Sequence, residues 1–174
     1  MIKITISAIL ILCFASLQAK ADDIKEFKLD SGIKVTIEEA PFDPKGHEII
    51  NCKGSEMPCL IDGGFPYGTD FSLPRSYLKK LIITYEGKSY SLDSSHMFNA
   101  WGNRPLEVKG VIRYLGGHCY DSKHCALRGL FSDAAGSYVA EWVVINGVPS
   151  RTVLTSSDDV VHLFMKNIDP PVYE

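Results

Sequence analysis

The chain has 174 residues, a formal net charge of −3, and 22% charged residues together with 45% hydrophobic ones. This length suits one domain with a sizeable core, and the mild acidity makes nucleic acid a poor partner. The sequence contains no phosphate-binding loop, dinucleotide fingerprint or H-E-x-x-H motif, so it predicts no cofactor.

The first residues have the organisation of an export signal. Residues 1–3 provide a positive start, residues 4–17 form an apolar run, and Ala19 and Ala21 occupy the positions that a signal peptidase reads. Cleavage after Ala21 would remove two lysines and no acids, which changes the formal charge from −3 to −5. The run is shorter than the roughly 20 apolar residues of a spanning helix, so no membrane anchor is predicted. We expect one disulfide-stabilised, β-rich domain (22–174) in the periplasm or secreted.

Five cysteines are present, and the first, Cys13, lies inside the export signal. No small residue precedes Cys13, which disfavours lipidation. The other four make an even set, and in an oxidising compartment they favour two disulfides. Their clustering favours the pairs Cys52–Cys59 and Cys119–Cys125, each worth about 2 kcal/mol in the chain-entropy model. Crossed pairing between the two clusters is the alternative.

Two hairpins are predicted in the first half of the mature chain. Apolar residues alternate with polar ones at 27–29 and 33–37, on either side of a Gly-containing turn. A second hairpin is predicted with strands at 81–85 and 89–92, which flank Glu86-Gly87-Lys88.

The segment between these hairpins is rich in glycine, proline and aromatic residues. Short strands are expected at 48–52 and 59–62, the second turning at Gly63-Gly64. A surface segment is expected at 93–104. Helical spacing of four apolar residues, with Pro74 in the first turn, predicts a short helix: Leu73, Tyr77, Leu78 and Leu81.

The last third is the most regular part of the sequence. Strands are predicted at 111–115, 126–131, 138–145 and 150–154, with a loop at 116–125 and an Asn146-Gly147 turn. Asn-Gly between two apolar runs is a strong hairpin signal, and sequential pairing of these strands gives a meander.

A helical period follows the last predicted strand. Ser156 or Ser157 can cap this helix, Asp158 and Asp159 suit its positive end, and Pro170-Pro171 terminates it. Its apolar stripe is predicted to consist of Val160, Leu163, Phe164 and Ile168. The fold class is therefore α+β and mainly β: antiparallel hairpins and a β-meander, with one C-terminal helix packed on the sheet.

Residues 116–125 form the densest group of potential metal ligands. His118-Cys119 and His124-Cys125 could hold zinc or copper, because imidazole and thiolate both suit these ions. Export to an oxidising space instead favours a loop closed by a disulfide, so we predict no metal. The sequence leaves open whether the two histidines bind one.

Aromatic residues on loops suggest a protein-recognition surface, since they provide contact area at a low entropy cost. The anchor residues that we predict are Tyr67, Phe98, Trp101 and Arg104. The alternative is that the aromatic side chains fold back and cover the edges of the sheet.

These features predict an exported, non-catalytic binding protein whose loops hold a protein partner. Small size, an export signal, mild acidity, two short disulfides and the lack of a catalytic motif together are similar to the profile of periplasmic immunity proteins, which block a toxin or cell-wall enzyme. The sequence contains no motif of such a family, so the resemblance assigns no functional role to any residue. The alternative is a small hydrolase, with His96 or His118 near an acid and a nucleophile such as Ser94 or Ser95. The sequence contains no G-x-S-x-G motif, which would have supported the hydrolase. A third possibility is an envelope-assembly protein that uses a sheet edge.

Overall fold

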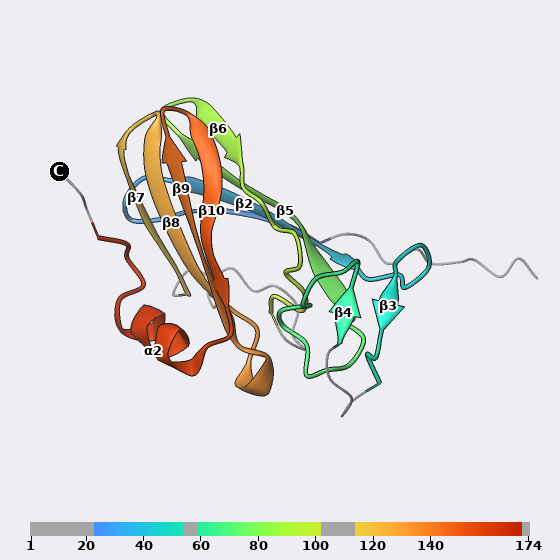
Figure 1. Ribbon diagram of the computed structural model, residues 1–174. Coiled ribbons are helices and arrows are strands. Elements are labelled where there is room, and N and C mark those ends of the chain that lie inside the picture. The colour runs from blue at the N-terminus through green and yellow to red at the C-terminus, as the bar shows by residue number, and fades with distance from the viewer. Residues whose placement is uncertain (1–22, 54–58, 102–113, 172–174) are drawn as a thin grey trace, which may run out of the picture.

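A computed structural model describes residues 23–53, 59–101 and 114–171 (Figure 1). These residues are mainly β, with one α-helix near the C-terminal end. The helix is α2 (Asp158–Lys166), and a short 3-10 turn lies at Ala134–Gly136. The strands are β1 (Asp23–Lys28), β2 (Lys34–Pro41), β3 (Ile49–Ile50), β4 (Leu60–Ile61), β5 (Ser76–Tyr85), β6 (Lys88–Ser91), β7 (Leu115–Asp121), β8 (His124–Phe131), β9 (Tyr138–Ile145) and β10 (Val148–Thr155).

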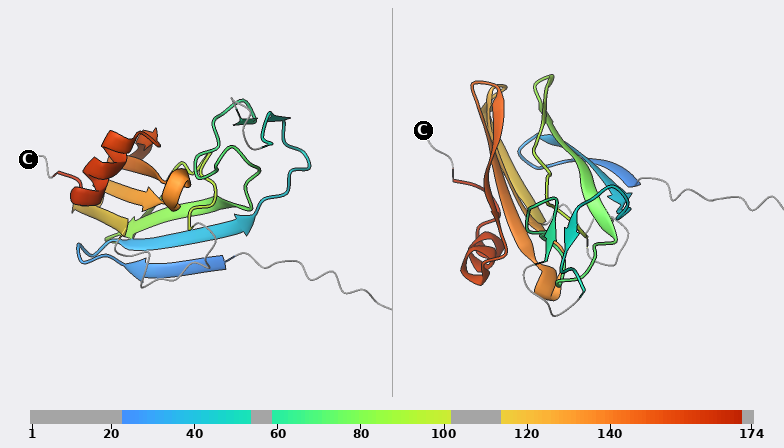
Figure 2. Two further views of the ribbon diagram at one scale, coloured as in Figure 1. Left: turned by 90° about the horizontal axis from the view of Figure 1, so that it is seen from below. Right: turned by 45° about the vertical axis from the view of Figure 1, so that its right-hand side comes forward.

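Two four-stranded sheets form the body of the molecule (Figure 2). The first sheet has the order β1-β2-β5-β6, and the second has the order β10-β9-β8-β7. All neighbouring strands in both sheets are antiparallel, and the second sheet is the predicted meander. Strands β3 and β4 form a separate two-stranded sheet between β2 and β5 in the chain. The predicted fold class is confirmed.

The main core lies between the two four-stranded sheets, because both contribute side chains to one buried apolar cluster. Ile37 and Leu81 come from the first sheet, and Trp142 and Tyr138 come from the second. The polar group of each of these two aromatic residues also makes a hydrogen bond. The Trp142 indole donates to the Asp93 carbonyl at 2.8 Å, and the Tyr138 hydroxyl donates to the Phe98 carbonyl at 3.2 Å. The second sheet therefore holds the loop that follows β6.

Helix α2 covers the outer face of the second sheet (Figure 1). Val161 and Phe164 are buried against Val139 of β9, whereas Leu163 is 54% exposed. The predicted helix is confirmed, but its buried face is centred on Val161 rather than Leu163. Ser157 is the N-cap, and its side chain makes no capping hydrogen bond. Across the described ranges, no helix combines the length and apolar character that crossing a membrane requires.

The helix predicted around Leu73–Leu81 is wrong, because this segment enters strand β5. The pairing of β2 with β5 skips one residue, Lys79, between the pairs Glu38↔Lys80 and Glu39↔Leu78. Such a bulge interrupts the two-residue alternation. Leu78 and Leu81 are consequently both buried although they are three residues apart, a spacing that imitates a helix.

The same bulge places two lysines beside one buried carboxylate. Lys79 Nζ lies 2.7 Å from one Glu38 carboxylate oxygen, and Lys80 Nζ lies 2.6 Å from the other. Glu38 is only 4% exposed. Hydrogen bonds from Lys79 and then Lys80 lower the pKa of Glu38 from 4.5 to about 2, against the opposing effect of burial.

Replacing Phe164 tests the observed face of the helix. Phe164→Ala should reduce the free energy of unfolding by about 3 kcal/mol, because it deletes a buried ring. Leu163→Ala, a matched change in the same helical turn, should alter it by no more than about 0.5 kcal/mol. Urea unfolding followed by circular dichroism measures both. Equal losses for the two variants would contradict the observed orientation of α2.

The ion pairs of Glu38 with Lys79 and Lys80 predict that the stability of the protein depends on pH. Since folding lowers this pKa, Glu38 stabilises the protein above pH 4.5, and that contribution is lost as the pH falls towards about 2. Glu38→Gln should therefore be less stable than the wild type at neutral pH, and the difference should shrink between pH 4.5 and 2. Urea unfolding across this pH range measures the difference. Parallel curves for the two proteins would refute the role of Glu38.

Candidate functional site

The hairpin of β7 and β8 contains the densest polar cluster of the sequence. Strand β7 runs over Leu115–Asp121 and β8 begins at His124, so most of the predicted loop at 116–125 is strand. Residues 111–113 lie outside the described residues. Gly116 and Gly117 are strand residues rather than part of the predicted loop. A Cβ on Gly116 would lie 2.5 Å from the Ile168 carbonyl oxygen, so only glycine lets the chain after α2 approach β7.

Both disulfides join the cysteines that are closest in the sequence. Cys52 is bonded to Cys59, and Cys119 is bonded to Cys125. Cys119 and Cys125 are directly opposite each other in the β7–β8 ladder, with their Cα atoms 4.0 Å apart. This second disulfide therefore locks the hairpin just below its turn, while the first closes a loop beside the two-stranded sheet.

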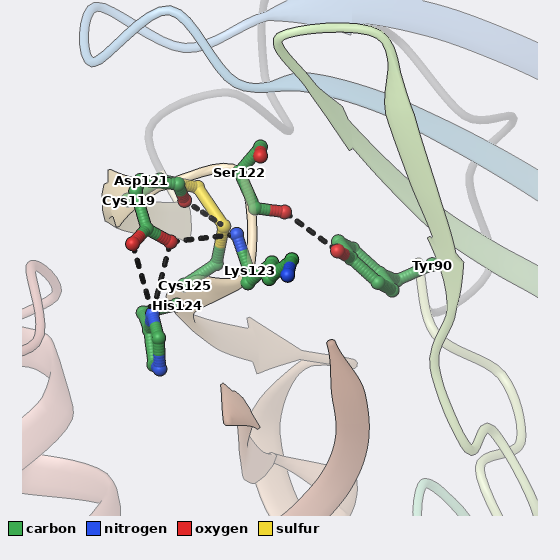
Figure 3. The surroundings of a disulfide bond; sticks show 7 residues. All are labelled: Tyr90, Cys119, Asp121, Ser122, Lys123, His124 and Cys125. Carbon is green, nitrogen blue, oxygen red and sulfur yellow. Dashed lines mark hydrogen bonds and ion pairs between the residues drawn. A yellow bond between two sulfur atoms is a disulfide. The ribbon is translucent and has the colours of Figure 1, made fainter. Parts of the chain in front are cut away.

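A hydrogen-bond network fixes the turn beyond the Cys119–Cys125 disulfide (Figure 3). The Lys123 backbone N–H donates to Asp121 at 2.7 Å, and His124 Nδ1 donates to the same carboxylate oxygen at 2.9 Å. These two donors hold the pKa of Asp121 below its ordinary value. His124 Nε2 lies 3.2 Å from Asn146 Oδ1, which links this turn to the turn between β9 and β10.

Two further contacts brace the turn from outside. The Tyr90 hydroxyl of β6 donates to the Ser122 carbonyl at 2.5 Å, as Figure 3 shows. The Gly147 backbone N–H donates to the Lys123 carbonyl at 3.0 Å. The β7–β8 turn is thus tied both to the first sheet and to the neighbouring hairpin, so its backbone is held before any partner arrives.

Large side chains project from this braced end of the molecule. Tyr120 occupies a bulge, because the β7–β8 register skips it between Cys119 and Asp121, and it is 79% exposed. Ile145 and Val148 flank the adjacent β9–β10 turn and are 57% and 63% exposed. Lys123 at the turn is also exposed. We call Tyr120, Lys123, Ile145 and Val148 the hairpin end.

The two histidines of the cluster are arranged differently. His124 is engaged by Asp121, whereas His118 lies opposite Ala126 within the ladder. Both neighbouring cysteines are bonded to each other, so neither offers a thiolate in this state. Within residues 23–53, 59–101 and 114–171, no group of three or more His, Cys, Asp and Glu side chains could hold a metal ion.

The three predicted anchor residues that the structure describes, Tyr67, Phe98 and Trp101, do not form one exposed surface. Phe98 is 7% exposed and packs edge-on against Phe42, with ring centroids 5.6 Å apart. Tyr67 and Trp101 are half-buried and pack against the main core, Trp101 against Phe131. Arg104 lies outside the described residues. The alternative expectation, that loop aromatics fold back on the sheets, describes Phe98, Tyr67 and Trp101 in this structure.

Of the residues singled out for hydrolysis, Ser94, Ser95 and His96 line one groove, and His118 does not. Arg151 of β10 donates to the Ser95 carbonyl at 2.7 Å and pairs with Asp93 at 3.0 Å, so this loop is anchored to the second sheet. The groove lies beside the two-stranded sheet, and Asp62 lines it as well. His118 belongs to the other end of the molecule, on β7.

Sequence reasoning missed Tyr120, Ile145 and Val148 as exposed groups. Ile145 and Val148 belong to apolar runs that predict burial, yet they are the residues next to the Asn146-Gly147 turn. At a hairpin tip the two faces of a sheet lose their covering layers, so apolar residues there can be exposed. Proximity to a tight turn is the signal that could have found them.

The chain matches no protein-family model, no curated protein and no solved structure in the comparisons made. The proposals below accordingly depend on the geometry of the described residues.

Removing the disulfide tests how much the hairpin depends on it. The double variant Cys119→Ser/Cys125→Ser should reduce the free energy of unfolding by about 2 kcal/mol. Amide hydrogen exchange at Asp121–His124 should accelerate, because the turn loses its covalent closure. The matched variant Cys52→Ser/Cys59→Ser should leave exchange in this turn unchanged. Unaltered protection in the first variant would show that hydrogen bonds alone hold the turn.

Proposed function

We propose that this protein is an exported binding protein that holds a protein partner with its hairpin end. The observation that carries the proposal is Tyr120, a 79% exposed aromatic residue on a turn closed by a disulfide. Exposed tyrosines on rigid loops are characteristic of protein-binding surfaces, because they bring contact area while losing few rotamers.

Pre-organisation supports the choice of this surface over the other exposed groups. The turn is held by the disulfide, by Asp121, by Tyr90 and by Gly147, so little backbone entropy is lost when a partner binds. Binding energy from Tyr120 and its apolar neighbours Ile145 and Val148 can then appear as affinity.

The projecting shape of the hairpin suggests how it would act. A rigid turn that carries an aromatic residue and a lysine fits into a concave site better than it covers a flat one. We infer that the hairpin end enters the active-site cleft of a partner enzyme and excludes its substrate. In this reading the protein is an inhibitor or immunity protein of the periplasm, acting on a toxin or a cell-wall hydrolase. The two disulfides support an oxidising compartment.

Site-specific crosslinking tests the proposal while the partner is still unidentified. A photoreactive phenylalanine analogue at position 120 should capture one protein from periplasmic extract of the source organism. The same analogue at Ile24, which is 55% exposed on the edge strand β1, is the matched control. Mass spectrometry of the crosslinked bands identifies the captured protein.

The purified partner then allows a quantitative test. Tyr120→Ala should weaken its affinity by about 2 kcal/mol, or roughly thirtyfold, and should weaken inhibition of the partner in parallel. Ile24→Ala should change the affinity less than about twofold. Identical capture at positions 120 and 24, or full inhibition by Tyr120→Ala, would count against the hairpin end as the binding surface.

A further inference from the structure

A groove of about 580 Å³ lies beside the two-stranded sheet, at the opposite end of β5 from the hairpin end. Its walls come from the segment that follows β2, the turn after β4, the start of β5, and the loop 94–98. Figure 1 shows these segments gathered around β3 and β4. The volume is within the range of small-molecule sites, roughly 300–1,000 Å³.

The carboxylates that line the groove already have hydrogen-bond donors. His47 Nδ1 donates to Asp62 Oδ2 at 2.6 Å, and the Glu48 backbone N–H donates to Asp62 Oδ1 at 3.0 Å. The first of these bonds, with help from the second, lowers the pKa of Asp62. Asp43 accepts the Lys45 backbone N–H at 3.0 Å. Both acids are therefore engaged by the protein itself.

Donors in the same groove are not engaged in this way. Among the described residues, neither the Lys45 ammonium nor the His96 ring has a hydrogen bond or ion pair. Lys79 also lines the groove, but its ammonium is bound to Glu38. The hydrogen-bond donors of Lys45 and His96 are therefore available to a ligand, whereas the acceptors of the groove are already used by the protein. This favours a ligand that accepts hydrogen bonds.

The position of the His96 ring is built into the fold. His96 has a φ of 60°, a backbone conformation that is uncommon outside glycine. Its ring lies directly on Gly64, where a Cβ would be 2.2 Å from the ring. A side chain at position 64 would displace the imidazole from the groove. The hairpin turn of β4 thus holds the imidazole in place.

The remaining wall of the groove is apolar. Phe42 packs against the His47 ring, with centroids 4.9 Å apart, and against Phe98. Ile61 and Met97 also line the groove. A ligand with an aromatic or aliphatic body could bury that body here.

We propose that this groove binds a small organic carboxylate, with the carboxylate on Lys45 and His96 and the apolar body against Phe42. The charged and titratable groups that line it are Asp43, Lys45, His47, Asp62, Lys79 and His96, and the carboxylates of Asp62 and Asp93 both interact electrostatically with His96. This binding is independent of the hairpin end and needs no protein partner.

Phenylacetate is a suitable probe, and 2-phenylethanol is its neutral counterpart. Binding of each probe is followed by NMR of the histidine ring protons and the backbone amides. Phenylacetate should give saturable shifts at His96 and around Phe42. The alcohol should bind at least tenfold more weakly because it carries no charge. Inorganic phosphate should also bind at least tenfold more weakly because it has no apolar body.

Variants separate the groove from nonspecific binding. Lys45→Ala/His96→Ala should weaken phenylacetate binding at least tenfold. The matched variant Lys88→Ala/His162→Ala removes an exposed lysine and an exposed histidine that lie outside both the groove and the hairpin end, and it should leave binding unchanged. Backbone amide spectra establish that both variants are folded. Absence of saturation in the wild type, equal binding of the alcohol or of phosphate, or an unaffected groove variant would each overturn the proposal.

Discussion

Face-to-face packing of the two four-stranded sheets positions every surface described above. Trp142 and Tyr138 are buried between the sheets, and their polar groups bind the carbonyls of Asp93 and Phe98. A buried indole or phenol without a partner would destabilise the core, so these bonds also hold the loop after β6 in place. The packing thereby determines where His96 lies, and it leaves the hairpin turns projecting at the opposite end.

The hairpin end combines two kinds of constraint. The Cys119–Cys125 bond limits the unfolded chain and closes the ladder, while the Asp121 network and the Tyr90 hydroxyl select one conformation of the turn. Neither constraint needs the side chain of Tyr120, which is the exposed residue of the bulge. The scaffold and the exposed group are therefore separable, and a partner surface could change at Tyr120 without loss of the turn.

Irregularities in the strands account for much of the chemistry at the surface. The bulge at Lys79 puts two ammonium groups on the Glu38 carboxylate, and the bulge at Tyr120 turns an aromatic ring to solvent. In both places one extra residue breaks the alternation of an antiparallel pair and redirects a side chain. Without the extra residue, side chains would alternate strictly between the two faces of each sheet through Lys79 and through Tyr120.

Local patterns were sufficient to predict the fold class, three hairpins, the C-terminal helix and the pairing of each cysteine with its near neighbour. These features depend on residues close together in the chain, such as those of the Asn146-Gly147 turn or Cys52 and Cys59, which are seven positions apart. The first half of β5 has the spacing of a helix because its bulge depends on pairing with β2, which is distant in sequence, whereas its second half is the strand that the sequence predicts. The exposure of Tyr120 depends on a bulge in the β7–β8 ladder. The burial of Phe98 and the meeting of His47, Asp62 and His96 in one groove depend on how the segments beside the two-stranded sheet pack together. Periodicity carries no information on such contacts, since they arise only when distant segments pack together.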